Sequence, residues 1–131
     1  MNNSNETKPA AALGDSLPVV IPAAKFRSEV LESKQPVLVV FWTPWSRPCQ
    51  VFDSVLQEVA RDWAGKIKVV KVNADEHLDL SLSYEIQSVP TLICFIGGRP
   101  CVRIVGTASK EAILEKLQAF SGDRCELRKG D

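Results

Sequence analysis

Along this chain, short continuous apolar runs alternate with segments in which apolar residues recur at helical spacing. The run Val37–Trp42 is continuously apolar, which is typical of a strand buried on both faces of a sheet. Further strands are predicted at 19–21, 67–72, 92–96 and 100–105. Gly97-Gly98 forms a two-residue hairpin turn between the last two strands. Pro100 has no backbone N–H, so we expect the last strand to lie at the sheet edge.

Apolar residues at helical spacing predict four helices, at 23–33, 47–64, 78–86 and 109–120. We expect Gly65 to end the second helix and Ser109 to cap the last. The predicted buried face of the second helix comprises Val51, Val55, Leu56, Val59, Ala60 and Trp63. The resulting order, β-α-β-α-β-α-β-β-α, predicts an α/β fold with a mixed central sheet and helices on both faces.

Length and composition fit a single domain at 19–120, between a disordered tail at 1–18 and a loose tail at 121–131. The 131 residues include 16 basic and 16 acidic side chains, a balance that gives no reason to expect nucleic acid or a membrane as partner. No apolar run is long enough to span a membrane and no signal region is recognisable, so we expect a cytoplasmic monomer. The spacing of the four cysteines matches no zinc site, and neither a metal nor a cofactor is expected.

The most informative stretch is Trp45-Ser46-Arg47-Pro48-Cys49, between the buried strand and the second helix. The turn delivers Ser46 and Cys49 to a helix N-terminus, where free N–H groups and the helix dipole favour a thiolate. This segment resembles the active site of the thioredoxin family, whose pattern is Trp-Cys-Gly-Pro-Cys. The resemblance covers 19–120 and implies the thioredoxin fold. Further matches are Lys71-x-Asn73-x-Asp75, Val89-Pro90-Thr91, Gly97-Gly98 and Gly106.

The same resemblance assigns chemical roles. In the family, the first cysteine attacks a substrate disulfide and the second resolves the mixed disulfide. Here Ser46 holds the nucleophile position and cannot form a disulfide, while Cys49 is kept as the resolving or single thiol. The sequence leaves open whether Ser46 is natural or introduced. Val40 stands where the family has a buried aspartate that moves a proton for the resolving cysteine. Impaired dithiol chemistry is therefore predicted, with Cys49 either a working monothiol or a partly buried structural thiol.

A substrate groove is also implied by the resemblance. In the family the bond before the proline at position 90 is cis, and the backbone of the preceding residue pairs with an extended substrate strand. Trp45, Arg47, Pro48, Val89 and Pro90 are accordingly expected to bind substrate. The implied partners are proteins or peptides with disulfides or extended segments, together with a thioredoxin reductase.

Two further cysteines are predicted to meet across the hairpin. A two-residue turn at Gly97-Gly98 places Cys94 opposite Cys101. We expect two reduced, buried thiols there in preference to a strained cross-strand disulfide. Cys125 falls in the predicted C-terminal tail, where exposure alone would make it reactive.

Three functions remain open from the sequence. The first is a family oxidoreductase with impaired dithiol chemistry that acts through Cys49. The second is a redox-inactive binding module that holds extended peptide segments beside Pro90. The third is a structural subunit that makes no use of the groove.

Overall fold

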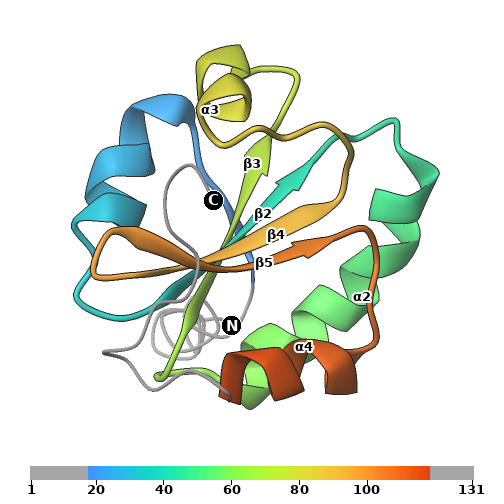
Figure 1. The fold of residues 1–131 in the computed structure, drawn as a ribbon. Helices are drawn as coiled ribbons and strands as arrows, with labels where there is room; N and C mark the ends of the chain where they lie inside the picture. Colours follow the sequence, from blue (N-terminus) through green and yellow to red (C-terminus); the bar gives the residue numbers. More distant parts are fainter. Residues whose placement is uncertain (1–17, 119–131) are drawn as a thin grey trace, which may run out of the picture.

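The computed structural model describes residues 18–118 of the chain, and a five-stranded mixed sheet lies at its centre (Figure 1). The strands are β1 (Val19–Val20), β2 (Val37–Trp42), β3 (Lys68–Asn73), β4 (Thr91–Ile96) and β5 (Arg99–Val105). Their order is β1-β3-β2-β4-β5. The first three strands are mutually parallel, whereas β4 and β5 run antiparallel to their neighbours. The predicted α/β fold and the edge position of the strand that contains Pro100 are therefore confirmed.

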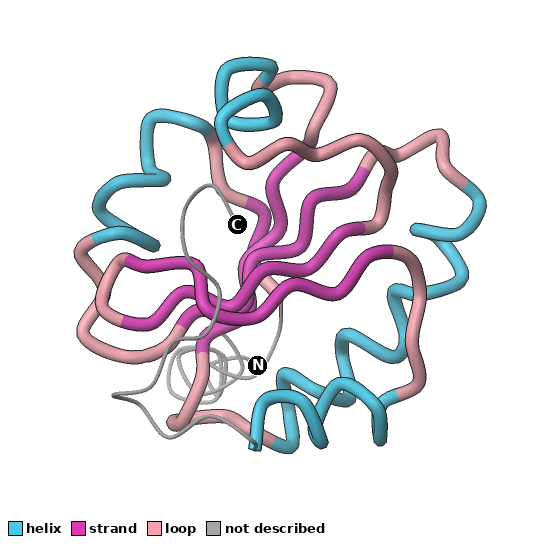
Figure 2. Tube along the Cα trace, viewed as in Figure 1, coloured by secondary structure: helices cyan, strands magenta, loops and turns pink. Residues whose placement is uncertain are grey.

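Helices cover both faces of this sheet, as Figure 2 shows. They are the 3₁₀ turn η2 (Ala23–Lys25), the π-helical turn η3 (Arg27–Leu31), α2 (Arg47–Asp62), α3 (Leu78–Ser83) and α4 (Lys110–Gln118). One core packs the sheet against α2 and α4, with Leu38, Phe52 and Ile113 among its buried members. The other packs Phe26 and Val30 of the η2–η3 segment, with Tyr84 after α3, against the opposite face. Because side chains alternate along a strand, β2 supplies residues to both cores.

Several predicted helices differ in detail from those observed. The segment 23–33 forms a 3₁₀ turn followed by a π turn in place of one regular helix, and Phe26 and Val30 stay buried. Helix α2 ends two residues earlier than predicted and α3 ends three residues earlier, whereas α4 begins directly after the predicted cap residue Ser109. Val51 was wrongly placed on the buried face of α2, because it is 64 % exposed. The buried residues of that helix are Cys49, Phe52, Leu56, Val59 and Ala60. Compared with the predicted buried face, the observed one therefore includes Cys49 and Phe52 in place of Val51.

The hairpin between β4 and β5 corrects the prediction for the cysteines. Phe95 pairs with Pro100 as expected, but a bulge follows and Cys94 lies opposite Val102 instead of Cys101. Cys94 is a free thiol, as predicted, whereas Cys101 takes part in a disulfide, so the expectation of two reduced thiols is wrong for Cys101. The extra residue at the bulge shifts the register by one position, which separates the two cysteines that a regular ladder would have paired.

The sequence also predicted two terminal tails and the absence of a membrane-spanning segment. The predicted tails at 1–18 and 121–131 lie outside the described residues, apart from residue 18. Within residues 18–118, every helix is too short or too polar to cross a bilayer.

Candidate functional site at the start of helix α2

Ser46 is the N-cap of helix α2 and fixes the geometry of the motif. Its backbone is extended, with φ −81° and ψ 120°, and its Oγ accepts a long hydrogen bond of 3.4 Å from the backbone N–H of Cys49. Pro48 lies within the first turn, where its missing N–H costs no helical hydrogen bond. The serine that replaces the expected nucleophile therefore has a defined structural role.

Neither side chain of the Ser-x-x-Cys motif is freely exposed. Ser46 is 4 % exposed and Cys49 is 7 % exposed. Cys49 belongs to the buried face of α2, together with Phe52 and Leu56. A thiol this deeply buried reacts slowly with bulky reagents, because the rate of thiol–disulfide exchange depends on access to the sulfur.

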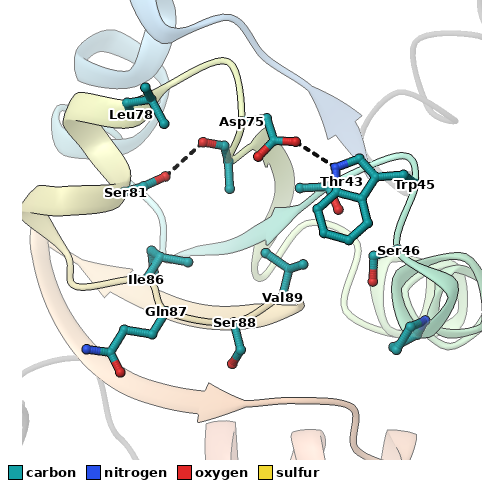
Figure 3. Close-up of a pocket in the computed structure, with 12 residues that line it drawn as sticks. Thr43, Trp45, Ser46, Asp75, Leu78, Ser81, Ile86, Gln87, Ser88 and Val89 are labelled. Carbon is teal, nitrogen blue, oxygen red and sulfur yellow. Dashed lines mark hydrogen bonds between the residues drawn. The ribbon is translucent and has the colours of Figure 1, made fainter.

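A cavity of about 540 Å³ opens beside the motif (Figure 3). It is lined by Thr43, Trp45, Ser46, Pro48, Ala74, Asp75, Leu78, Ser81, Ile86, Gln87, Ser88 and Val89. We call this cavity the groove. Its Trp45 side is held by a hydrogen bond of 2.6 Å that the indole Nε1 donates to Asp75 Oδ2. Trp45 is nonetheless 68 % exposed, so it presents a large apolar surface in a fixed orientation.

The opposite side of the groove comes from the segment before β4. The Val89–Pro90 peptide bond is cis. Thr91 Oγ1 donates a hydrogen bond of 2.7 Å to the carbonyl of Ser88, and the Gly106 N–H donates one of 2.8 Å to the carbonyl of Pro90. These bonds tie the segment to β4 and to the end of β5, and leave the Val89 side chain at the cavity wall.

The structure brings together most, but not all, of the residues singled out in the sequence. Trp45, Ser46, Pro48 and Val89 line the groove, and Pro90 is buried next to it. Arg47 is exposed and does not line the groove, because the first helical turn directs it elsewhere. Cys49 does not line the groove either. It borders a different cavity.

This second cavity has a volume of about 330 Å³ and is lined by Trp42, Cys49, Gln50, Asp53 and Lys71. Lys71 Nζ lies 3.0 Å from Asp53 Oδ1 and 4.2 Å from the centre of the Trp42 ring. Gln57 Nε2 donates a hydrogen bond of 2.9 Å to Asp53 Oδ2. Burial opposes the ionisation of Asp53, but the hydrogen bonds from Lys71 and Gln57 outweigh it and hold the pKa of this carboxyl below its usual value.

Sequence reasoning missed this charged pair. The Lys71 side chain on β3 is only 15 % exposed, and Asp75, two residues after the strand, accepts a hydrogen bond from Trp45. The sequence did contain one sign that Asp53 lies near the motif thiol. Asp53 follows Cys49 by four residues and therefore lies on the same face of the helix. No cluster of three or more potential metal ligands occurs within residues 18–118.

Comparison with known proteins agrees with this fold. The family model described as Thioredoxin matches residues 18–119. A thioredoxin from Griffithsia pacifica is 44 % identical over 93 residues, which cover 71 % of this chain and 85 % of the relative. Thioredoxin 1 from a Nostoc strain is 45 % identical over 93 residues, covering 71 % and 87 %. A bifunctional thioredoxin reductase/thioredoxin from Mycobacterium leprae is 37 % identical over 99 residues, covering 76 % of this chain and 22 % of that protein.

Proposed function

Since this chain belongs to the thioredoxin family of disulfide oxidoreductases, we propose that it keeps a peptide-binding groove and lacks dithiol turnover. One observation carries the proposal: the groove is bordered by Ser46, whereas Cys49 borders a different cavity. A disulfide that enters the groove therefore meets a hydroxyl, which cannot take part in thiol–disulfide exchange. The remaining thiol is 7 % exposed and has no neighbouring cysteine within the motif.

The groove retains features that suit an extended peptide. Its walls are largely apolar, and Leu78 of α3, which lines the groove with Trp45, is itself an exposed apolar residue. Thr43 supplies a polar anchor: it is 2 % exposed, lines the groove, and its Oγ1 has no hydrogen-bond partner among the described residues. A buried hydroxyl without a partner costs free energy, so a peptide carbonyl placed beside Thr43 would be stabilised.

The partners we propose are proteins that present extended segments to the groove. Members of the family act on protein substrates, and one relative is fused to a thioredoxin reductase. A reductase that regenerates a motif dithiol would find no Ser46–Cys49 disulfide to reduce. The function that we propose is therefore non-covalent peptide binding, without turnover coupled to a reductase.

A binding measurement tests the groove directly. The probe is the separated insulin B chain with its cysteines carboxymethylated, which offers an extended segment without a disulfide. We expect Trp45→Ala and Thr43→Val to weaken its binding, whereas Val51→Ala, at an exposed apolar residue outside the groove, leaves it unchanged. Equal binding by all three variants and the parent chain, or no binding by the parent chain, would contradict the proposed peptide site.

A further inference from the structure

The second cavity gathers three groups that can act together on one sulfur atom. The Cys49 thiol, the Asp53 carboxylate and the Lys71 ammonium all border it. Cys49 and Asp53 are one helical turn apart on α2, and Lys71 approaches from β3. The thiol therefore has a small approach route of its own, distinct from the groove that Ser46 borders.

The strand register explains why a carboxylate stands on the helix at this point. Lys71 of β3 is the partner of Val40 of β2, and in parallel strands such partners point to the same side of the sheet. That side is packed against α2. A partly buried ammonium needs an anion nearby, and Val40 cannot supply one. Asp53 supplies it from the helix, at 3.0 Å.

We propose that Cys49 is a single-thiol modification site for small uncharged hydroperoxides that enter through this second cavity. Asp53 relays the thiol proton to the leaving oxygen of the peroxide, directly or through a water molecule, and Lys71 balances the charge of the thiolate. This inference goes beyond peptide binding and does not depend on it.

The chemical step balances without a second cysteine. The Cys49 sulfur attacks one oxygen of the peroxide, an S–O bond forms and the O–O bond breaks. Sulfur is oxidised to the sulfenic acid, and the leaving oxygen takes the relayed thiol proton and departs as water from hydrogen peroxide, or as an alcohol from an alkyl hydroperoxide. Ser46 cannot condense with the product to give a disulfide. Trp42 borders the same cavity, and its indole Nε1, a buried donor without a partner among residues 18–118, would hydrogen-bond the new oxygen.

Cys94 provides an internal comparison. It is 2 % exposed, and burial raises the pKa of its thiol to about 12. It borders a separate cavity of about 70 Å³ that contains neither Asp53 nor Lys71. We therefore expect Cys94 to stay unmodified for as long as the domain is folded.

The test measures modification of Cys49 in the folded full-length chain, by hydrogen peroxide with dimedone trapping and by iodoacetamide, with peptide mass spectrometry as readout. We expect Asp53→Asn to slow both reactions by about tenfold and Asp53→Glu to recover most of the rate. The matched control is Glu29→Gln, which removes the carboxylate of a comparable 2.8 Å pair with Lys68 away from Cys49 and should leave both rates unchanged.

Two cavity-filling variants separate the routes of entry. Gln50→Trp adds bulk to the second cavity and should slow the modification of Cys49, whereas Ser88→Trp adds bulk to the groove and should not. Continued protection of Cys94 shows that each variant is folded. Equal rates for Asp53→Asn and Glu29→Gln, slowing by Ser88→Trp alone, or modification of Cys49 only after unfolding would each overturn the proposal.

Discussion

The Oγ of Ser46 accepts a hydrogen bond from the backbone N–H of Cys49 at 3.4 Å, so Ser46 caps the helix that carries the Cys49 thiol. Under the function that we propose, Ser46 stands where the family has its nucleophilic cysteine, and the two residue types make different contributions. Cysteine supplies chemistry, whereas serine supplies an acceptor for an otherwise unpaired helical N–H. The substitution therefore exchanges reactivity for local helix stability.

Removing this cap should destabilise the domain. We expect Ser46→Ala to lower the free energy of unfolding by about 1 kcal/mol, because the Cys49 N–H loses its acceptor. Urea denaturation measures the change. Ser109→Ala is the matched comparison, since Ser109 Oγ accepts the Ala112 N–H at 3.0 Å at the start of α4. A Ser46→Ala variant as stable as the parent chain, beside a destabilised Ser109→Ala variant, would argue against the capping role.

Restoring the cysteine should restore the missing disulfide. In Ser46→Cys, the introduced thiol and Cys49 lie three residues apart on the first turn of α2, the spacing that the family uses. We expect mild oxidation to lower the mass by two hydrogens more than the Cys101 disulfide alone accounts for, and reduction to recover them. The double variant Ser46→Cys/Cys49→Ala is the control and should show only the change that the Cys101 disulfide causes. If the single variant never forms the bond, the geometry of the turn has drifted from that of the family.

The pair between Asp53 and Lys71 should make stability depend on pH in acid. The pKa of the Asp53 carboxyl in the folded protein lies below its ordinary value of 3.8. The pair therefore stabilises the fold above that value, and its contribution is lost as the pH falls through the lower folded pKa. We expect the parent chain to lose more stability below about pH 4 than Asp53→Asn does. Urea titrations at several pH values measure this difference.

Glu29 contributes in the same direction, because the Lys68 hydrogen bond and charge lower the pKa of its carboxyl. The comparison is therefore best made between Asp53→Asn and Asp53→Asn/Glu29→Gln, so that each pair is assessed in turn. An acid transition of Asp53→Asn that is indistinguishable from that of the parent chain would contradict the assignment to Asp53.

The glycine turn between β4 and β5 should tolerate no side chain at Gly98. Its φ is +81°, and an added Cβ would lie 2.6 Å from the backbone oxygen of Leu31. Gly65 has a similar φ of +84° but open space around it. We expect Gly65→Ala to cost about 1–2 kcal/mol from the left-handed backbone alone. Gly98→Ala should cost clearly more, because the Leu31 backbone must also move. Equal costs in thermal or urea unfolding would show that the contact is not a close one.

The apolar pattern was sufficient to predict the strands of the sheet and the position of the motif between a strand and a helix. The continuous run at Val37–Trp42 predicted a strand buried on both faces, and it is the central strand β2. The turn residues at Gly97-Gly98 predicted the hairpin, because both have φ above zero as a two-residue turn requires. The pattern did not reveal the bulge that moves Cys101 away from Cys94, since a bulge adds one residue without changing the apolar character of either strand.

The parts of the site that escaped prediction depend on contacts between distant segments. Asp53 and Lys71 are 18 residues apart and meet only because α2 packs across β3. Trp45 and Asp75 are 30 residues apart and meet through a single hydrogen bond. That Ser46 and Cys49 would border different cavities was not visible in the motif, because the spacing fixes their helical positions but not what packs around them.

The measurement that tests the central claim most directly is the reduction of disulfide-bonded insulin by dithiothreitol, compared for the parent chain, Ser46→Cys and Cys49→Ala. We predict that the parent chain and Cys49→Ala leave the uncatalysed rate unchanged, whereas Ser46→Cys accelerates it. Turnover by the parent chain that disappears in Cys49→Ala would contradict the account, because it would make Cys49 a working monothiol reached by protein substrates despite its burial behind Ser46.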